Sequence, residues 1–325
     1  MTENQASKPR IGAVAIGRNE GDRLVGCLQS LRGEVARLVY VDSGSTDNSM
    51  GRAQDIGAVV VELDMSKPFT AARARNAGFA ALTSDGDIDL VQFIDGDCEM
   101  DADWLSSATK FLAEHPDVAV VCGRRRERFP DATMWNGFAE EEWAGGVAGN
   151  VKACGGDALM RVEAFNDVLG FNESLIAGEE PELCVRLRGH GWKIWRLEQT
   201  MTHHDAEMTQ FRQWWQRAKR AGYTYAEGVA MHGAAPERHN VDKLRRTLLW
   251  GLLIPLVTVF AMYFSSWGSL LLLLWPIQIC RLIFKGMRPL SAIFLMIAKF
   301  AELQGAALWT WRRLSRKQAS LIEYK

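Results

Sequence analysis

The chain has 325 residues and a formal net charge of −1 at pH 7, enough for one sizeable domain with an appendage or for two domains. The near-neutral balance excludes the broad basic field that attracts nucleic acid, so we expect no nucleic-acid partner. Its six cysteines form no CxxC pair and no zinc-type spacing, which predicts reduced thiols in a cytosolic compartment. The N-terminal MTENQASKPR has no apolar run, so we expect no cleavable signal peptide.

Short apolar runs alternate with helical patterns in the N-terminal half. Leu24, Leu28 and Leu31 recur at helical spacing after the first run. This alternation predicts an α/β fold with a parallel sheet covered on both faces. Ligands bind such sheets beyond the carboxyl ends of the strands. The predicted strands are residues 11–16, 38–41, 58–63 and 90–94.

The segment DSGSTDNS begins with Asp42 at the end of the second predicted strand. Its serines, glycine and threonine supply a turn that can cap the next helix. Asp42 either stabilises that turn or accepts a hydrogen bond from a nucleobase imide or a ribose hydroxyl. We favour the nucleotide contact, because Asp95 ends another strand at the same predicted edge of the sheet.

The segment FTAARARNAGFAAL places Arg73 and Arg75 two residues apart, so on a helix they point in different directions. The alanines and the glycine around them allow close backbone approach. Either both arginines are solvated, or one of them reaches a base or a phosphate.

The segment FIDGDCEM ends a buried strand with two carboxylates, Asp95 and Asp97, on either side of Gly96. Mg²⁺ and Mn²⁺ prefer such hard oxygen ligands, and Mg²⁺ commonly takes one or two protein carboxylates together with substrate phosphates. The glycine lets the backbone turn so that both acids face one ligand. The other interpretation is a turn with solvated acids; we favour the metal site.

A helix is predicted in LIAGEEPELCVRLRGHGWKIWRL, where Pro181 suits a first helical position and Gly189 the end. The pair Glu179-Glu180 opens it. An acid at a helix N-terminus is stabilised as its anion, which suits a general base that must be deprotonated at neutral pH. The strand WKIWRL follows, and after it His203-His204-Asp205.

Two further segments are candidates for acceptor binding. The stretch VCGRRRERFP contains Arg124 and three more arginines, which either form a solvated loop or grip an acceptor phosphate, since arginine matches phosphate bidentately. The loop KACGGDALM contains Asp157, which could bind a sugar hydroxyl.

The last 80 or so residues are much more apolar. Residues 247–264 carry no charge, and residues 267–284 carry only Arg281. Both segments reach the roughly 17–25 residues that a membrane helix needs. Basic residues lie before the first segment and after the second, and none lies in the linker between them. The sequence therefore predicts a membrane hairpin at about residues 247–284 with both ends in the cytoplasm.

The third apolar stretch, at about residues 290–312, is interrupted by Lys299 and Glu302. If it crossed the membrane, the basic RRLSRK would be exported, against the charge rule. We therefore expect it to lie on the cytoplasmic interface, anchored by Trp309 and Trp311. The alternative is that all three segments pack as a soluble helical domain. We place the domain boundary at 240, with a catalytic domain at residues 1–240 and membrane-associated helices at 241–325.

Four segments in this order, AIGRNEGDRLVGCLQSL, VYVDSGSTDNS, ARARNAG and FIDGDCEM, resemble the family 2 glycosyltransferases of the GT-A fold, in their membrane-anchored bacterial form. The resemblance covers roughly residues 10–235. It implies an inverting enzyme of the hexosyl-transfer type that uses a nucleotide-sugar donor with Mg²⁺ or Mn²⁺. The implied donor-binding residues are Gly17, Glu20, Asp42, Arg75 and Asp95, and the implied metal ligand is Asp97.

The second half extends the resemblance. The family's Glu-Asp acceptor motif appears here as Glu179-Glu180, which implies that Glu180 is the catalytic base and that Glu179 lies beside the acceptor. Asp157 and Arg124 are the further candidates for acceptor binding, from the chemistry of their side chains. His204, in preference to His203, resembles the family's late metal ligand. The segment QFRQWWQRAKR is not the Gln-x-x-Arg-Trp motif of processive synthases.

These features predict a glycosyltransferase anchored in the cell inner membrane with its catalytic domain in the cytoplasm. Its acceptor would be a hydroxyl of a saccharide, lipid-linked because membrane helices bring the site to the lipid, in polysaccharide or glycan synthesis. One alternative is a polyprenyl-phosphate glycosyltransferase, whose anionic acceptor needs no base. Another is a catalytically silent membrane protein that binds nucleotide.

Overall fold

The computed structural model describes residues 8–316. The chain forms two compact units, residues 1–207 and 208–325. This division comes before residue 240, where we placed the boundary, because helix α8 (Phe211–His232) packs along helix α12 (Pro289–Leu314) inside the second unit.

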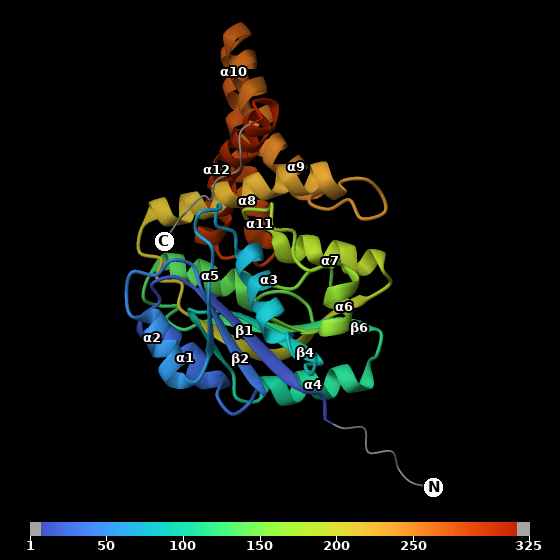
Figure 1. The fold of residues 1–325 in the computed structure, drawn as a ribbon. Helices are drawn as coiled ribbons and strands as arrows, with labels where there is room; N and C mark the ends of the chain where they lie inside the picture. Colours follow the sequence, from blue (N-terminus) through green and yellow to red (C-terminus); the bar gives the residue numbers. More distant parts are fainter. Residues whose placement is uncertain (1–7, 317–325) are drawn as a thin grey trace. The chain divides into compact units, whose positions relative to one another are not determined.

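The first unit contains one mixed sheet (Figure 1). Its neighbouring strands follow the order β3-β2-β1-β4-β8-β6-β9-β5, and β7 pairs with β9. Strands β1 to β4 are parallel neighbours, as the sequence predicts. The sheet is not parallel throughout, because β8 runs antiparallel to both β4 and β6. The strands are β1 (Ile11–Gly17), β2 (Arg37–Asp42), β3 (Val59–Glu62), β4 (Leu90–Asp95), β5 (Cys98–Met100), β6 (Val118–Glu127), β7 (Gly149–Asn150), β8 (Ala158–Arg161) and β9 (Lys193–His204).

The register of the central strands aligns the ends that carry the predicted site. Gly17 at the end of β1 pairs with Asp42 at the end of β2. Ile16 pairs with Asp95 at the end of β4. Because parallel strands finish at the same edge, two of the acids lie beside the end of β1.

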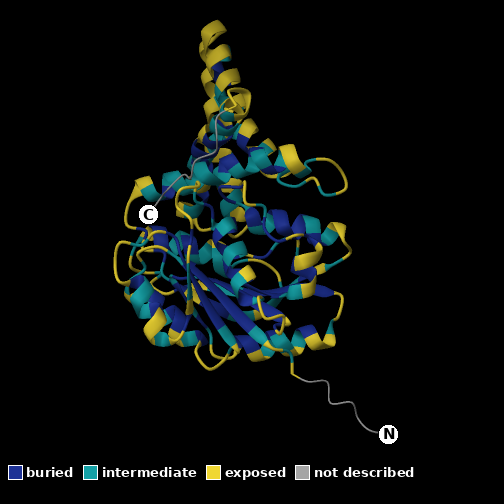
Figure 2. Cartoon of the chain, viewed as in Figure 1, coloured by how far each residue is buried: buried dark blue, intermediate teal, exposed yellow. Residues whose placement is uncertain are grey.

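Helices cover the sheet, and their apolar faces form the core with the buried strands (Figure 2). In α1 the buried positions include Leu24, Leu28 and Leu31, the spacing read from the sequence. In α3 the small residues allow close approach: a Cβ at Gly78 would lie 2.4 Å from Val14 Cγ1 of β1. The helices of this unit are α1 (Asp22–Leu31), α2 (Ser49–Ile56), α3 (Ala71–Leu82), α4 (Trp104–Glu114), α5 (Met134–Ala144), α6 (Val162–Asp167) and α7 (Glu179–Gly189).

The second unit is helical. Within residues 8–316, three helices are long and apolar enough to cross a membrane, namely Val241–Phe264, Ser266–Phe284 and Pro289–Leu314. Much of α10 is exposed (Figure 2), as a lipid-facing helix would be. After α8, its elements are α9 (Val241–Leu248), a π-helical turn η1 (Leu249–Leu253), α10 (Ile254–Phe264), a 3₁₀ segment η2 (Ser266–Leu273), α11 (Leu274–Phe284) and α12 (Pro289–Leu314).

Helix α12 also qualifies as a spanning helix by length and composition, although we expect it at the interface. The two charges that interrupt it pair with each other, with Lys299 Nζ 2.7 Å from Glu302 Oε1. The same carboxylate accepts a hydrogen bond from Thr247 Oγ1 of α9. The pairing removes much of the cost of placing these charges among apolar helices.

Candidate active site

Arg75 is the centre of a buried ion-pair cluster. It lies in the second turn of α3 and is 2% exposed. Its Nη2 contacts Asp95 Oδ1 at 2.7 Å, and its Nη1 lies 2.6 Å from Glu179 Oε1 and 3.6 Å from Glu180 Oε1. Burial disfavours the guanidinium charge, but the surrounding carboxylates outweigh it and raise the pKa of Arg75 above its usual value. The cluster thus joins the end of β4 to the start of α7.

Asp95 also receives a second arginine. Its Oδ2 lies 3.2 Å from Arg125 Nη2 of β6. Burial favours the protonated acid, but Arg75 and Arg125 outweigh that effect and lower the pKa of Asp95. Asp95 is therefore an anion fixed in place by two cations, which suits a carboxylate that must accept hydrogen bonds from a ligand.

The sequence interpretation did not single out Arg125 among its neighbours. The side chains of the basic cluster separate: Arg124 pairs with Glu198, whereas Arg126 pairs with Glu140. Arg125 alone of these three reaches the site acids. The pairing of β6 with β9 shifts on both sides of Arg124, so the alternation of a regular strand gave no simple signal for Arg125. The expectation that Arg124 contacts an acceptor remains untested, and in this structure it is engaged by Glu198 and the Ala144 carbonyl.

Asp157 supports the cluster from behind. It is fully buried, and its oxygens accept hydrogen bonds from the Asp95 backbone N–H at 3.0 Å, from Thr202 Oγ1 at 2.7 Å and from Arg125. These contacts let Asp157 hold Asp95 and Arg125 in place, and its predicted contact with an acceptor sugar stays a prediction.

Glu180 differs from Glu179 in exposure and in its partners. The side chain of Glu179 is 4% exposed and held by Arg75, whereas that of Glu180 is 17% exposed. Burial and the neighbouring charge of Glu179 raise the pKa of Glu180 to about 7, although Arg75 acts in the other direction. A carboxylate with a pKa near neutrality that solvent can reach is suited to accept a proton.

Gly156 brings Glu180 and Asp95 to one place. A Cβ at this glycine would lie 3.0 Å from Glu180 Oε1, 3.1 Å from Asp95 Oδ2 and 2.8 Å from Arg75 Nη2. The loop before β8 therefore closes tightly over the cluster, and any side chain here would push into it.

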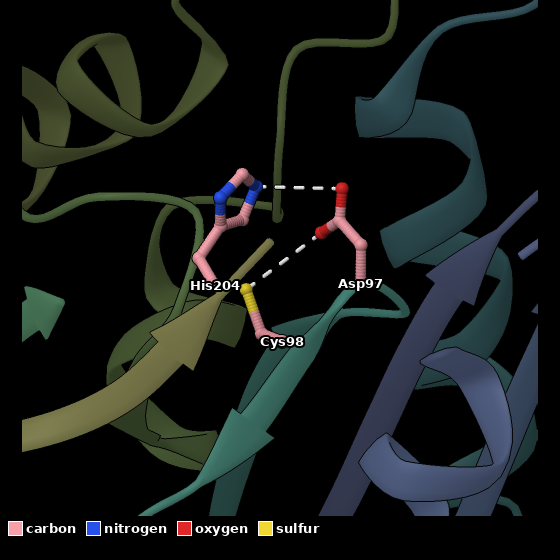
Figure 3. A group of neighbouring side chains, drawn as sticks. All are labelled: Asp97, Cys98 and His204. Carbon is pink, nitrogen blue, oxygen red and sulfur yellow. Dashed lines mark hydrogen bonds and ion pairs between the residues drawn. The ribbon is translucent and has the colours of Figure 1, made fainter. Parts of the chain in front are cut away.

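The second carboxylate of the Asp-Gly-Asp segment faces a histidine (Figure 3). His204 Nε2 lies 3.3 Å from Asp97 Oδ2, and the Cys98 thiol donates to Asp97 Oδ1 at 3.7 Å. Strand pairing causes this, because Cys98 of β5 lies opposite His204 of β9. The position of Gly96 leaves little room for a side chain, because a Cβ there would lie 3.1 Å from the Ile16 carbonyl oxygen.

The donor chemistry of this cluster fits Mg²⁺ or Mn²⁺. Ligand atoms of Asp97, Cys98 and His204 lie within 4.8 Å of one another. Burial raises the pKa of the Cys98 thiol well above its usual value. Mg²⁺ and Mn²⁺ prefer hard oxygen ligands to sulfur, so the Asp97 carboxylate and the His204 imidazole are the candidate ligands. Behind the ring, Glu127 Oε2 lies 3.8 Å from His204 Nδ1, and such outer carboxylates orient metal-binding histidines.

The two adjacent histidines are distinguished by the alternation of β9. His204 is buried, and its ring packs edge-on against Trp143 of α5 at 4.4 Å. His203 is exposed and lies 3.6 Å from Asp101. Burial favours the neutral ring of His204, but Asp97 and Glu127 together raise its pKa. His204 is therefore the one of the two that faces Asp97, and its role as a metal ligand stays a prediction.

The predicted nucleoside contacts lie at the ends of β1 and β2. Asp42 Oδ2 accepts from the backbone N–H groups of Gly44 and Ser45 at 2.9 and 2.8 Å, so the carboxylate does form the turn. Its other oxygen accepts from Tyr40 at 2.9 Å. Glu20 pairs with Arg23 at 2.9 Å, and a Cβ at Gly17 would lie 3.0 Å from the Glu20 side chain. These residues line the end of the strand pair, and their donor-binding role stays a prediction.

The mixed α/β sheet and its covering helices form a fold of the GT-A type. A mannosyltransferase from Pyrobaculum calidifontis, solved with GDP-Man and Mn²⁺, matches with a TM-score of 0.66 at 16% identity over 95% of this chain and 89% of that one. Glucosyl-3-phosphoglycerate synthase from Mycobacterium tuberculosis, solved with Mn²⁺, UDP and product, matches with a TM-score of 0.52 at 17% identity over 70% of this chain and 81% of that one.

A family model matches the N-terminal part of the chain. Residues 14–169, just under half of the chain, match the model of glycosyl transferase family 2. The succinoglycan biosynthesis protein ExoA of Rhizobium meliloti is 28% identical over 197 residues, which is 56% of this chain and 59% of that protein. A pre-mycofactocin glycosyltransferase of Mycobacterium tuberculosis is 30% identical over 61% of this chain and 43% of its own length. The chain thus spans about half the length of these relatives.

Proposed function

We propose that the protein is an inverting glycosyltransferase that moves a sugar from a nucleoside-diphosphate sugar to a hydroxyl of a lipid-linked saccharide in glycan or polysaccharide synthesis. The observation that carries the proposal is the placement of Glu180, a carboxylate with a pKa of about 7, at the same point as Asp95, which Arg75 and Arg125 hold. The family match, the similarity to a succinoglycan biosynthesis protein and the similarity to a pre-mycofactocin glycosyltransferase support the reaction class.

The donor lies at the carboxyl ends of the parallel strands in this proposal. Asp42 and Glu20 line the nucleoside end, and Gly17 leaves the backbone open beside them. Asp95 accepts from the sugar or the ribose, because its charge is kept by two arginines. Arg75 orients the donor through Asp95 and holds Glu179 away from the reacting atoms.

The acceptor hydroxyl is deprotonated by Glu180 as its oxygen attacks the anomeric carbon in line with the departing diphosphate. One proton passes to the carboxylate, one C–O bond forms and one breaks, and the sugar configuration inverts. Glu179 cannot take the same place, since its carboxylate is buried against Arg75. Asp157 and Thr202 keep the cluster fixed while this occurs.

Asp97 and His204 would hold Mg²⁺ or Mn²⁺, which when bound supplies Lewis-acid stabilisation of the diphosphate leaving group. Glu127 orients the His204 ring, and Trp143 packs against it. The two similar structures were solved with Mn²⁺, which supports a divalent cation here. The apolar helices of the second unit would anchor the enzyme in the cell inner membrane, with the catalytic unit in the cytoplasm.

Calorimetric titration with nucleoside diphosphates, with and without Mn²⁺, tests the donor part of this proposal. We expect binding to require the cation, and we expect Asp97→Ala and His204→Ala each to weaken the cation-dependent part by at least about tenfold. His203→Ala is the matched control and should bind normally, because that ring faces Asp101. Unchanged affinity in Asp97→Ala would remove it from the metal site, and nucleotide binding with no sugar transfer would favour a catalytically silent protein.

A further inference from the structure

An apolar groove of about 690 Å³ lies in the second unit, beside the first candidate membrane span. Val229 of α8 contributes to it, and the other lining residues come from α9, η1 and the start of α10. Eight of the nine lining side chains are valine or leucine. The remaining one is Arg245, in the last turn of α9. The volume lies in the range of small-molecule sites.

The groove occupies the face of the span that does not pack on α12. Two positions one helical turn apart face α12 instead: Thr247 bonds to Glu302, and a Cβ at Gly251 would lie 2.6 Å from the Lys299 carbonyl oxygen. That side is closed by backbone contact, whereas most of the leucines of the other side are exposed.

The π-helical turn Leu249–Leu253 shapes the groove. Pro255 has no N–H, and its ring conflicts with the carbonyl four residues earlier, which here belongs to Gly251. The helix passes this point with a widened turn. Leu249, Leu252 and Leu253 of that turn line the groove. Such π segments occur often at functional sites.

Arg245 gives the groove a charged end. It is exposed, and it forms no ion pair or side-chain hydrogen bond with any residue in the 8–316 range that the structure describes. The site arginines contrast with it, since Arg75 and Arg125 are both paired with carboxylates. At the far end, a second apolar hollow of about 570 Å³ shares Leu256 and extends to Tyr263. From Arg245 to Tyr263 the helix rises about 27 Å, close to the roughly 30 Å of a bilayer's hydrocarbon core.

We propose that this groove binds the hydrocarbon chain of a phosphate-bearing lipid, with the phosphate on Arg245, and that this lipid is the carrier of the acceptor saccharide. The identification as acceptor carrier rests on the proposed function. A guanidinium binds phosphate bidentately, and basic positions at the ends of membrane helices bind anionic head groups. The groove offers a long hydrocarbon chain a continuous apolar wall, with one cation, Arg245, at the end where the phosphate would bind.

Native mass spectrometry of the full chain in detergent tests the site, with a polyprenyl phosphate as the probe. We expect the natural protein to retain the lipid and Arg245→Gln to bind it about tenfold more weakly, the scale of one charge-assisted contact. Arg246→Gln is the matched control, since it removes the same charge from an exposed neighbour that does not line the groove. It should change affinity less than twofold. Leu252→Trp, which fills the groove, should also release the lipid.

Two results would overturn the proposal. If Arg245→Gln and Arg246→Gln lost the same affinity for the lipid, the positive charge would attract the lipid independently of the groove. If phosphatidic acid bound as tightly as the polyprenyl phosphate, and its binding also depended on Arg245, the groove would be a general site for anionic lipids. The proposal that it binds the acceptor carrier would then be wrong. Nucleoside diphosphate binding by each variant checks that the first unit is intact. The lipid measurement uses no donor and no turnover, so it is separate from the test of the proposed function. A protein without transferase activity could still bind the lipid, and an enzyme that acts on a water-soluble acceptor could be active without binding it.

Discussion

Glu180→Gln should bind the donor as the natural protein does, yet transfer sugar about 10²–10⁴-fold more slowly, the usual contribution of a general base. The amide keeps the size of the side chain and can still accept a hydrogen bond, but it cannot take the acceptor proton. Donor binding should be preserved because the contacts of Asp95 with Arg75 and Arg125 do not involve Glu180. Single-turnover transfer from a preferred nucleotide-sugar to a hydroxyl acceptor measures the effect.

Glu179→Gln is the control for this experiment. Its carboxylate is buried and contacts Arg75 at 2.6 Å, so we expect a smaller loss of turnover, with a lower stability. If Glu179→Gln were the inactive variant and Glu180→Gln near normal, the base would be the other residue of the pair. If both variants stayed active, the reaction would need no base here, and a polyprenyl-phosphate acceptor would be the better assignment.

Arg75→Met should be the most destabilising substitution in the site. The neutral side chain leaves the buried carboxylate of Glu179 without its cation and removes one of the two arginines that hold Asp95. Breaking a buried pair such as Arg75–Glu179 costs about 3–5 kcal/mol. Chemical denaturation followed by circular dichroism measures the free energy of unfolding. Adding Glu179→Gln should recover part of the loss, because it removes the orphaned charge.

Arg73→Met is the matched control on the same helix. Its guanidinium donates to the exposed loop carbonyls of Asp64, Lys67 and Pro68, and its loss should cost within about 1 kcal/mol. If both variants lost the same free energy of unfolding, the loss of any arginine from α3 would be enough to explain it. The ion-pair cluster around Arg75 would then contribute little to stability.

The strands and helices that carry the site were predictable where one physical signal dominated. Burial requires apolar residues along β1, β2 and β4 and at the leucine positions of α1. The sequence pattern therefore agrees with the structure in these elements. The carboxylates at the ends of these strands follow from parallel register. The antiparallel β8 was not predictable, since the four residues Ala158–Arg161 carry too little pattern to show their direction.

Arg125 and the extent of the second unit show what local pattern misses. In β6 the pairing with β9 shifts on both sides of Arg124, so simple alternation did not reveal which arginine of four turns to Asp95. Helix α8 looked like part of the catalytic domain because it precedes the apolar segments. Its packing on α12, including Trp214 against Phe294 at 5.1 Å, is a long-range contact that only the fold reveals.

The pH dependence of single-turnover transfer tests the central claim, that Glu180 is the base, most directly. The raised pKa means that Glu180 is protonated below about pH 7 and ionised above it, so the rate should rise with pH through an apparent pKa near 7 and then level off. In Glu180→Gln this rise should disappear along with most of the rate. A natural enzyme whose rate stays flat from pH 5.5 to 8.5, or a Glu180→Gln variant that keeps the same rise, would contradict the account.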